Sequence, residues 1–178
     1  MKTHLSTKLP GRTRLTKASV LAFVFLTVVA QVHAGDIDIR LTARRVLAKP
    51  GGQELLQPAE SAFPGDIVQY DAVYHNRSAR AVSNLQPTLP IPAGMEYIPD
   101  SARPAPAQAS LDGRRFEPIP LKRKVTLASG KVREEEVPPA EYRALRWAIG
   151  DLAAAGTTNI VARTRLVPAA PPPRLSKN

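Results

Sequence analysis

The stretch that decides the fold is residues 64–76, Pro-Gly-Asp-Ile-Val-Gln-Tyr-Asp-Ala-Val-Tyr-His-Asn. Its opening, Pro64-Gly65-Asp66, is typical of a tight turn, because glycine adopts a positive φ without strain and aspartate bonds nearby backbone amides. From residue 67 to residue 75 the side chains alternate, which predicts a strand with one buried face. We expect the buried face to carry Val68, Tyr70, Ala72 and Tyr74, and the other face Gln69, Asp71 and His75.

Similar alternation elsewhere in the chain predicts further strands at residues 36–42, 94–98, 143–149 and 158–167. Residues 82–91 also look extended, but Pro87 and Pro90 cannot donate to a ladder, so we expect an edge strand or one broken by bulges. Residues 49–66, 99–112 and 150–156 are expected to be connections, the last with room for one helical turn. The pattern predicts an all-β chain, a single immunoglobulin-like β-sandwich of about seven strands.

Residues 119–137 predict an extra, charged hairpin that turns at Ser129-Gly130. A two-residue turn would pair Lys124 with Glu135 and Arg123 with Glu136, and opposite charges facing each other across strands stabilise the pairing. This pairing accounts for the acidic run at residues 134–136 without a cation-binding role.

The first 34 residues have the pattern of a secretory signal peptide. Five basic residues and no acidic one precede or flank a short apolar run at residues 18–30, and Val32-His33-Ala34 offers a cleavage site. The alternative is an uncleaved membrane anchor, although the run is shorter than the roughly 20 residues that span a bilayer. We therefore expect residues 1–34 to be a signal peptide, 35–167 the β-sandwich domain and 168–178 a proline-rich flexible tail, with the protein exported to the periplasm or the extracellular space.

The charge and cysteine counts narrow the possible functions. The chain has 25 Lys and Arg residues and 15 Asp and Glu residues, but residues 1–34 hold five of the basic ones, which leaves a net charge of +5 for the rest. That balance is an ordinary soluble surface and predicts no nucleic-acid partner. The absence of cysteine excludes disulfides, thiolate metal sites and cysteine nucleophiles. We expect no cofactor, no metal, and no membrane span once the signal is cleaved.

Three segments together resemble one family. They are residues 64–76; residues 84–98, which include Ile91-Pro92-Ala93-Gly94-Met95-Glu96-Tyr97; and Trp147-Ala148-Ile149-Gly150-Asp151-Leu152. In order and spacing they are similar to the bacterial conserved-repeat domain, also called domain of unknown function eleven. The resemblance spans about residues 60–167 and implies an exported, immunoglobulin-like structural or adhesive module with no catalytic residue set. Two departures are Leu89, where the family usually has Asp, and the single copy with its inserted hairpin.

We expect the residues that carry the resemblance to be architectural; they are Pro64, Gly65, Asp66, Tyr70, Asn76, Pro92, Gly94, Tyr97, Trp147 and Gly150. An interaction face is a separate possibility, because several arginines fall on the solvent sides of predicted strands. If those strands are neighbours, they form one ridge that could meet an anionic glycan or a partner protein; the alternative is a scattered, solvated surface. The candidates for this face are Arg40, Arg146, Arg163 and Arg165.

Enzymatic chemistry has little support in the sequence. His75 is the only histidine after residue 34, and no cysteine or glycine-flanked serine elbow accompanies it. Asp36 and Asp38 could contribute to a calcium site only with partners from elsewhere. The leading hypothesis is a non-enzymatic exported module that binds another envelope or surface protein or glycan, by strand addition or through the arginines. The alternative is a structural, self-assembling envelope subunit whose sheet edge pairs with copies of itself.

Overall fold

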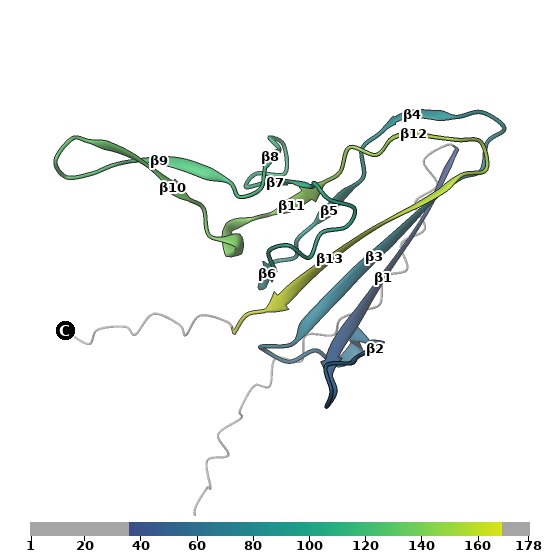
Figure 1. The fold of residues 1–178 in the computed structure, drawn as a ribbon, viewed down its shortest axis with the longest axis horizontal. Helices are drawn as coiled ribbons and strands as arrows, with labels where there is room; N and C mark the ends of the chain where they lie inside the picture. Colours follow the sequence, from purple (N-terminus) through teal and green to yellow (C-terminus); the bar gives the residue numbers. More distant parts are fainter. Residues whose placement is uncertain (1–35, 169–178) are drawn as a thin grey trace, which may run out of the picture.

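The computed structural model describes residues 36–168 and shows an all-β sandwich (Figure 1). The predicted signal peptide and all but the first residue of the predicted tail lie outside these residues. The first layer is a five-stranded antiparallel sheet in the order β2-β1-β3-β13-β6. Its strands are β1 (Ile37–Ala48), β2 (Glu54–Pro58), β3 (Ile67–Asn76), β6 (Met95–Tyr97) and β13 (Thr157–Leu166).

The second layer consists of two small antiparallel sheets that lie end to end, because the strands β4 and β5 are consecutive in the chain, as are β11 and β12. One has the order β5-β11-β7-β8 and the other pairs β12 with β4. The strands are β4 (Val82–Leu85), β5 (Thr88–Pro90), β7 (Gln108–Ser110), β8 (Glu117–Pro118), β11 (Ala144–Arg146) and β12 (Gly150–Leu152). Bonds from Trp147 N to Pro87 O (3.0 Å) and from Ile149 N to Leu85 O (3.0 Å) join the two ladders.

The core lies between these layers and is made from the alternating residues that the sequence predicts. Tyr70 and Ile160 of the first layer and Leu89 and Leu145 of the second belong to one buried cluster. The β3 residues predicted to face inward, Val68, Tyr70, Ala72 and Tyr74, are all buried. The prediction of an all-β sandwich is therefore confirmed.

The charged hairpin is present, but its predicted register is wrong by one residue. Strands β9 (Lys122–Thr126) and β10 (Val132–Glu136) pair Lys124 with Glu134 and Arg123 with Glu135. The register differs because the hairpin loop has three residues, 128–130, and not two. Gly130 is its last residue and has a φ of 79°, and the loop is closed by the bond from Leu127 N to Lys131 O. Opposite charges still face each other, and the hairpin projects away from the two layers (Figure 1).

Several expected connections contain short strands. Strand β2 lies within residues 49–66, and β7 lies within residues 99–112 at the centre of its ladder. Residues 150–152 form β12, within the segment 150–156 that the sequence predicts to be a loop. Within residues 36–168 the only helices are two 3-10 turns, η1 (Ala59–Ser61) and η2 (Pro139–Glu141). Each of these three strands has only three to five residues, and β7 and β12 pair with strands that are distant in sequence.

Candidate functional site

The two Gly-containing turns of the family-like motif are architectural. Asp66 N donates to Phe63 O (2.9 Å), with Pro64 and Gly65 (φ 97°) as the central residues, and Met95 N donates to Pro92 O (3.1 Å), with Gly94 (φ 80°) in the equivalent place. A positive φ at the third position favours glycine. The carboxylate of Asp66 also accepts from Phe63 N (2.8 Å), as expected of an aspartate in such a turn.

Asn76, at the end of β3, is a buried structural centre. Its side-chain amide nitrogen donates to the carbonyl oxygens of Arg80 (2.7 Å), Leu152 (3.1 Å) and Ala153 (2.9 Å). Its oxygen accepts from the backbone amide (3.0 Å) and the hydroxyl (2.8 Å) of Ser78. Asn76 is fully buried, so it joins the turn after β3 to the loop after β12 and presents nothing to a partner.

The large aromatic residues of the motif serve the core in the same way. Trp147 is 1% exposed, and its indole nitrogen donates to Pro104 O (2.9 Å), which ties the loop before β7 to β11. Tyr97 stacks on Tyr142 with ring centroids 6.0 Å apart, and burial raises the pKa of Tyr97 and of Tyr70. Gly150 has a φ of 82° where the register between β12 and β4 shifts.

The four candidate arginines lie on two different layers. Arg40 on β1 and Arg163 and Arg165 on β13 share the outer face of the five-stranded sheet, because they stand opposite Val73, Gln69 and Ile67 of β3. Arg146 lies on β11 in the second layer, with its guanidinium 3.6 Å from the centre of the Phe116 ring and its Nε bonded to Thr88 Oγ1 (3.3 Å). These arginines therefore do not form one ridge.

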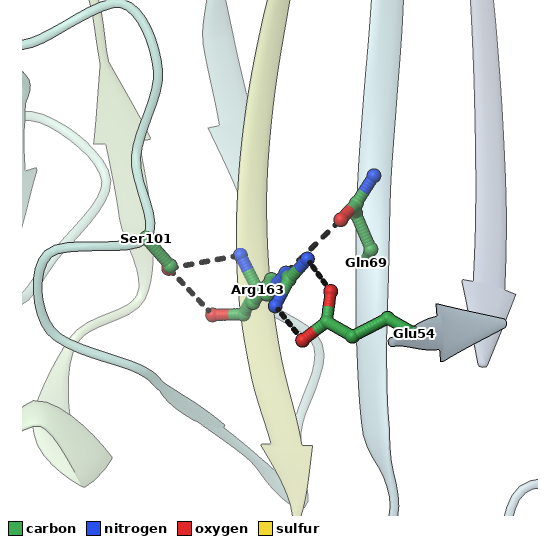
Figure 2. A network of polar contacts seen from close by, with 4 residues as sticks. All are labelled: Glu54, Gln69, Ser101 and Arg163. Atoms are coloured by element: carbon green, nitrogen blue, oxygen red, sulfur yellow. Dashed lines mark hydrogen bonds and ion pairs between the residues drawn. The ribbon is translucent and has the colours of Figure 1, made fainter. Parts of the chain in front are cut away.

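Arg163 is held within the molecule by a polar network, as Figure 2 shows. Its guanidinium donates to both carboxylate oxygens of Glu54 (2.8 and 2.6 Å) and to Oε1 of Gln69 (3.0 Å). The hydrogen bond from Arg163 lowers the pKa of Glu54. The hydroxyl of Ser101 accepts from Arg163 N (3.0 Å) and donates to Arg163 O (3.3 Å). It therefore supplies the hydrogen bonds that the backbone of a neighbouring strand would otherwise make to Arg163. Arg163 thus joins β2, β3 and β13.

Arg40 and Arg165 are exposed and form no ion pair with the described part of the chain. Their β3 neighbours, Val73 and Ile67, are six positions apart, which corresponds to about 20 Å along the sheet. Two isolated cations at that distance do not make a binding patch for a compact anion.

The residues weighed for catalysis or metal binding have ordinary surroundings. His75 Nδ1 is 3.0 Å from Thr157 Oγ1, and Asp38 stands opposite His75 across the β1–β3 ladder. Among residues 36–168, no three His, Asp or Glu side chains are grouped in a way that could hold a metal ion. A hollow of about 200 Å³ lies beside β7 and the start of β9, lined in part by Ser110, Asp112 and Lys122. Backbone amides of Arg115 and Arg114 and the Ser110 hydroxyl lower the pKa of Asp112 to about 2, so this carboxylate is already used to hold its loop.

A feature that sequence reasoning did not locate is the open edge of β1. Strand β2 pairs only with residues 44–48 of β1, so residues 37–43 have β3 on one side and no strand of residues 36–168 on the other. In Figure 1, β1 lies at the side of the sheet with β3 and β13 beyond it. We call residues 37–43 the β1 edge.

The hydrogen-bonding groups of the β1 edge follow from its register. Arg77 N donates to Asp36 O (2.7 Å), which continues the β1–β3 pairing and shows that even-numbered residues of β1 bond to β3. Backbone groups of successive residues point to opposite sides of a strand. The amide and carbonyl groups that point to the open side therefore belong to Ile37, Ile39, Leu41 and Ala43, whose side chains pack against the core.

Other edges of the two layers are short or interrupted by proline. The outer strand of the second layer, β4 followed by β5, contains Pro87 and Pro90, as the prediction of an edge or broken strand required. At the far side of that layer β8 has two residues, and one of them is Pro118. Strand β2 ends at Pro58 and β6 has three residues. Proteins commonly shorten or interrupt edge strands to prevent pairing with other chains. The β1 edge has no proline and no lysine, so it is the edge most suited to accept a strand.

No family model matches the chain, and neither a curated protein nor a solved structure matches it. The likeness to the conserved-repeat domain thus rests on the residue pattern alone. Within residues 36–168, none of the helices has the length and apolarity needed to cross a membrane.

Proposed function

We propose that this chain is a non-enzymatic, exported β-sandwich module that binds a cell-envelope or surface protein by strand addition at the β1 edge. The observation that carries the proposal is the open half of β1 in a sandwich whose other edges, among residues 36–168, are short or contain proline. The signal-like residues 1–34 and the pattern similar to the conserved-repeat domain support the export of the chain and a role as an interaction module.

Strand addition suits the chemistry of this edge. The backbone groups of Ile37, Ile39 and Leu41 would bond to an extended segment, and main-chain hydrogen bonds of this kind supply affinity in strand-addition complexes. The same three side chains are half-buried at the margin of the core, so an added strand with apolar residues in register would extend that core. Arg40 and Thr42 are exposed on the outer face and would contact the added strand's polar side chains.

The interactions of the polar side chains also support a binding role better than a catalytic one. Arg163, Arg146, Asn76 and Asp112 each have partners that hold strands or loops in place. An enzyme needs a nucleophile, a base and an orienting group within reach of one another. The single histidine among the described residues has a threonine hydroxyl as its side-chain hydrogen-bond partner.

Site-specific photocrosslinking in cells tests the proposal. A photoreactive residue is placed at Thr42, which is exposed on the β1 edge, in the full chain expressed with its N-terminal segment in a Gram-negative host. The matched control carries it at Arg165, which is exposed on the same face of the same sheet but on β13. We expect a discrete protein adduct from position 42 and none from position 165. No adduct from position 42, or the same adducts from both positions, would contradict strand addition at this edge.

A further inference from the structure

We infer that the strand added at the β1 edge comes from a second copy of this chain, paired antiparallel with the first about a two-fold axis at Ile39. The inference rests on the proposed use of this edge and names its partner. It would join two five-stranded sheets into one continuous sheet, with both outer faces on the same side.

The direction of the backbone groups limits the registers that two β1 edges can adopt. In an antiparallel pair, residues that point their amide and carbonyl groups at each other must stand opposite one another. The groups at the open edge belong to odd-numbered residues, so odd must pair with odd. Placing Ile39 opposite Ile39 of the second copy also sets Ile37 opposite its Leu41, and this register forms about six backbone hydrogen bonds.

The charges on the outer face select this register. With Ile39 at the axis, Asp38 faces Arg40 of the second copy and Arg40 faces its Asp38, so two opposite-charge pairs form by symmetry. Neither Asp38 nor Arg40 has an ion pair with the described residues of its own chain. These facing positions do not share hydrogen bonds, and in such pairs the side chains lie closer together.

The adjacent registers that keep odd opposite odd are unfavourable. A shift that sets Arg40 opposite itself brings two guanidinium groups together, and the opposite shift sets Asp38 opposite itself. Like charges directly opposite across strands are destabilising. The order Asp38-Ile39-Arg40 is therefore self-complementary in one register only.

The projecting hairpin offers no comparable pairing between two copies. Strand β9 carries Lys122, Arg123 and Lys124, and β10 carries Glu134, Glu135 and Glu136. A symmetric contact between two β9 strands or two β10 strands would place like charges together. Of these exposed strands, the β1 edge is the one whose charge order fits its own copy.

Charge reversal tests the inference, with sedimentation velocity of the purified full chain over a wide range of concentrations as the measurement. We expect the wild-type chain to show a monomer–dimer equilibrium that weakens as salt is added. Asp38→Arg alone and Arg40→Asp alone each turn both attractive pairs into repulsive ones, and each is expected to raise the dimer dissociation constant about tenfold or more. The double variant Asp38→Arg/Arg40→Asp restores opposite charges in the same register and is expected to restore dimerisation.

The double variant also controls for folding, because it contains both substitutions. Arg165→Asp is the matched control, since it reverses an exposed arginine on the same face away from the edge, and it should leave the equilibrium unchanged. A wild-type chain that stays monomeric at its highest soluble concentration overturns the inference, as does a dimer that both single reversals leave intact.

The crosslinking at Thr42 separates failure of this inference from failure of the proposed function. An adduct with the mass of two chains supports the pairing of two copies. An adduct with a different protein, from a chain that is monomeric in solution, overturns the pairing of two copies and leaves strand addition standing. The absence of any adduct removes both.

Discussion

The sandwich body and the β9–β10 hairpin are stabilised in different ways. In the body, single buried side chains hold several segments: Asn76 bonds to the turn after β3 and to the loop after β12, and Trp147 bonds to Pro104. In the hairpin, the ladder carries exposed charges, and buried contacts lie at its base, where Leu121 N donates to the Tyr142 hydroxyl and Val137 N donates to Leu121 O. We infer that a few buried side chains stabilise the body, whereas the loop and the order of charges along the two strands determine the register of the hairpin.

The largest effect is expected from removing the Asn76 side chain. Asn76→Ala leaves the buried carbonyl of Leu152, and the part-buried carbonyl of Ala153 and amide of Ser78, without their partner, and an unsatisfied buried group costs about 1–3 kcal/mol. We expect the free energy of unfolding to fall by about 3 kcal/mol, measured by urea denaturation. Asn159→Ala, at an exposed asparagine of β13, is the control and should change stability by less than about 0.5 kcal/mol. Equal losses in the two variants would show that the body does not depend on this buried centre.

An intermediate effect is expected where the hairpin joins the body. The Tyr142 hydroxyl accepts from Leu121 N (3.0 Å), and both residues are buried. Tyr142→Phe keeps the ring and its stacking on Tyr97 but leaves that amide unsatisfied, so we expect a loss of about 1–2 kcal/mol. Hydrogen exchange at the Leu121 amide should quicken together with this loss.

Tyr74→Phe is the control for the hairpin base. Tyr74 is buried in the body, and its hydroxyl makes no hydrogen bond with residues 36–168, so its removal should change stability little. If Tyr142→Phe leaves exchange at Leu121 unchanged, the hairpin is held by its ladder alone, and the contrast between the two regions becomes sharper.

The sequence predicts the body well because alternation alone decides which residues face inward. The inward set on β3, with Leu145 and Trp147 near β11 and Ile160 and Ala162 on β13, is buried as that pattern requires. The strands β2, β7 and β12 could not be found in this way, because three to five residues show too little periodicity, and β7 and β12 pair with strands that are distant in the chain. The roles of Asn76 and Arg163 were hidden for the same reason: their partners lie 76 and 109 positions away in the chain.

The open β1 edge illustrates a further limit of sequence reasoning. The alternation of Ile37, Ile39 and Leu41 shows which face is buried, but it does not show that β2 stops pairing at Arg44. Which side of a strand lacks a neighbour is a property of the whole sheet. A signal was still available, since the predicted strand at 82–91 contains two prolines and the strand at 36–42 contains none.

The smallest effect is expected at the hairpin tip, and it tests why the predicted register was wrong. Gly130 has a φ of 79°, and a Cβ there would meet no atom within 4 Å, so Gly130→Ala introduces backbone strain without a clash. We expect it to weaken the hairpin by about 1 kcal/mol, seen as faster hydrogen exchange at Leu127 N, while the global unfolding of the body changes little. Gly130→Asn should be milder, because asparagine tolerates the left-handed region better than alanine does. If alanine and asparagine act alike, the three-residue loop does not depend on this conformation, and the charge pairs between β9 and β10 would instead be what sets the register.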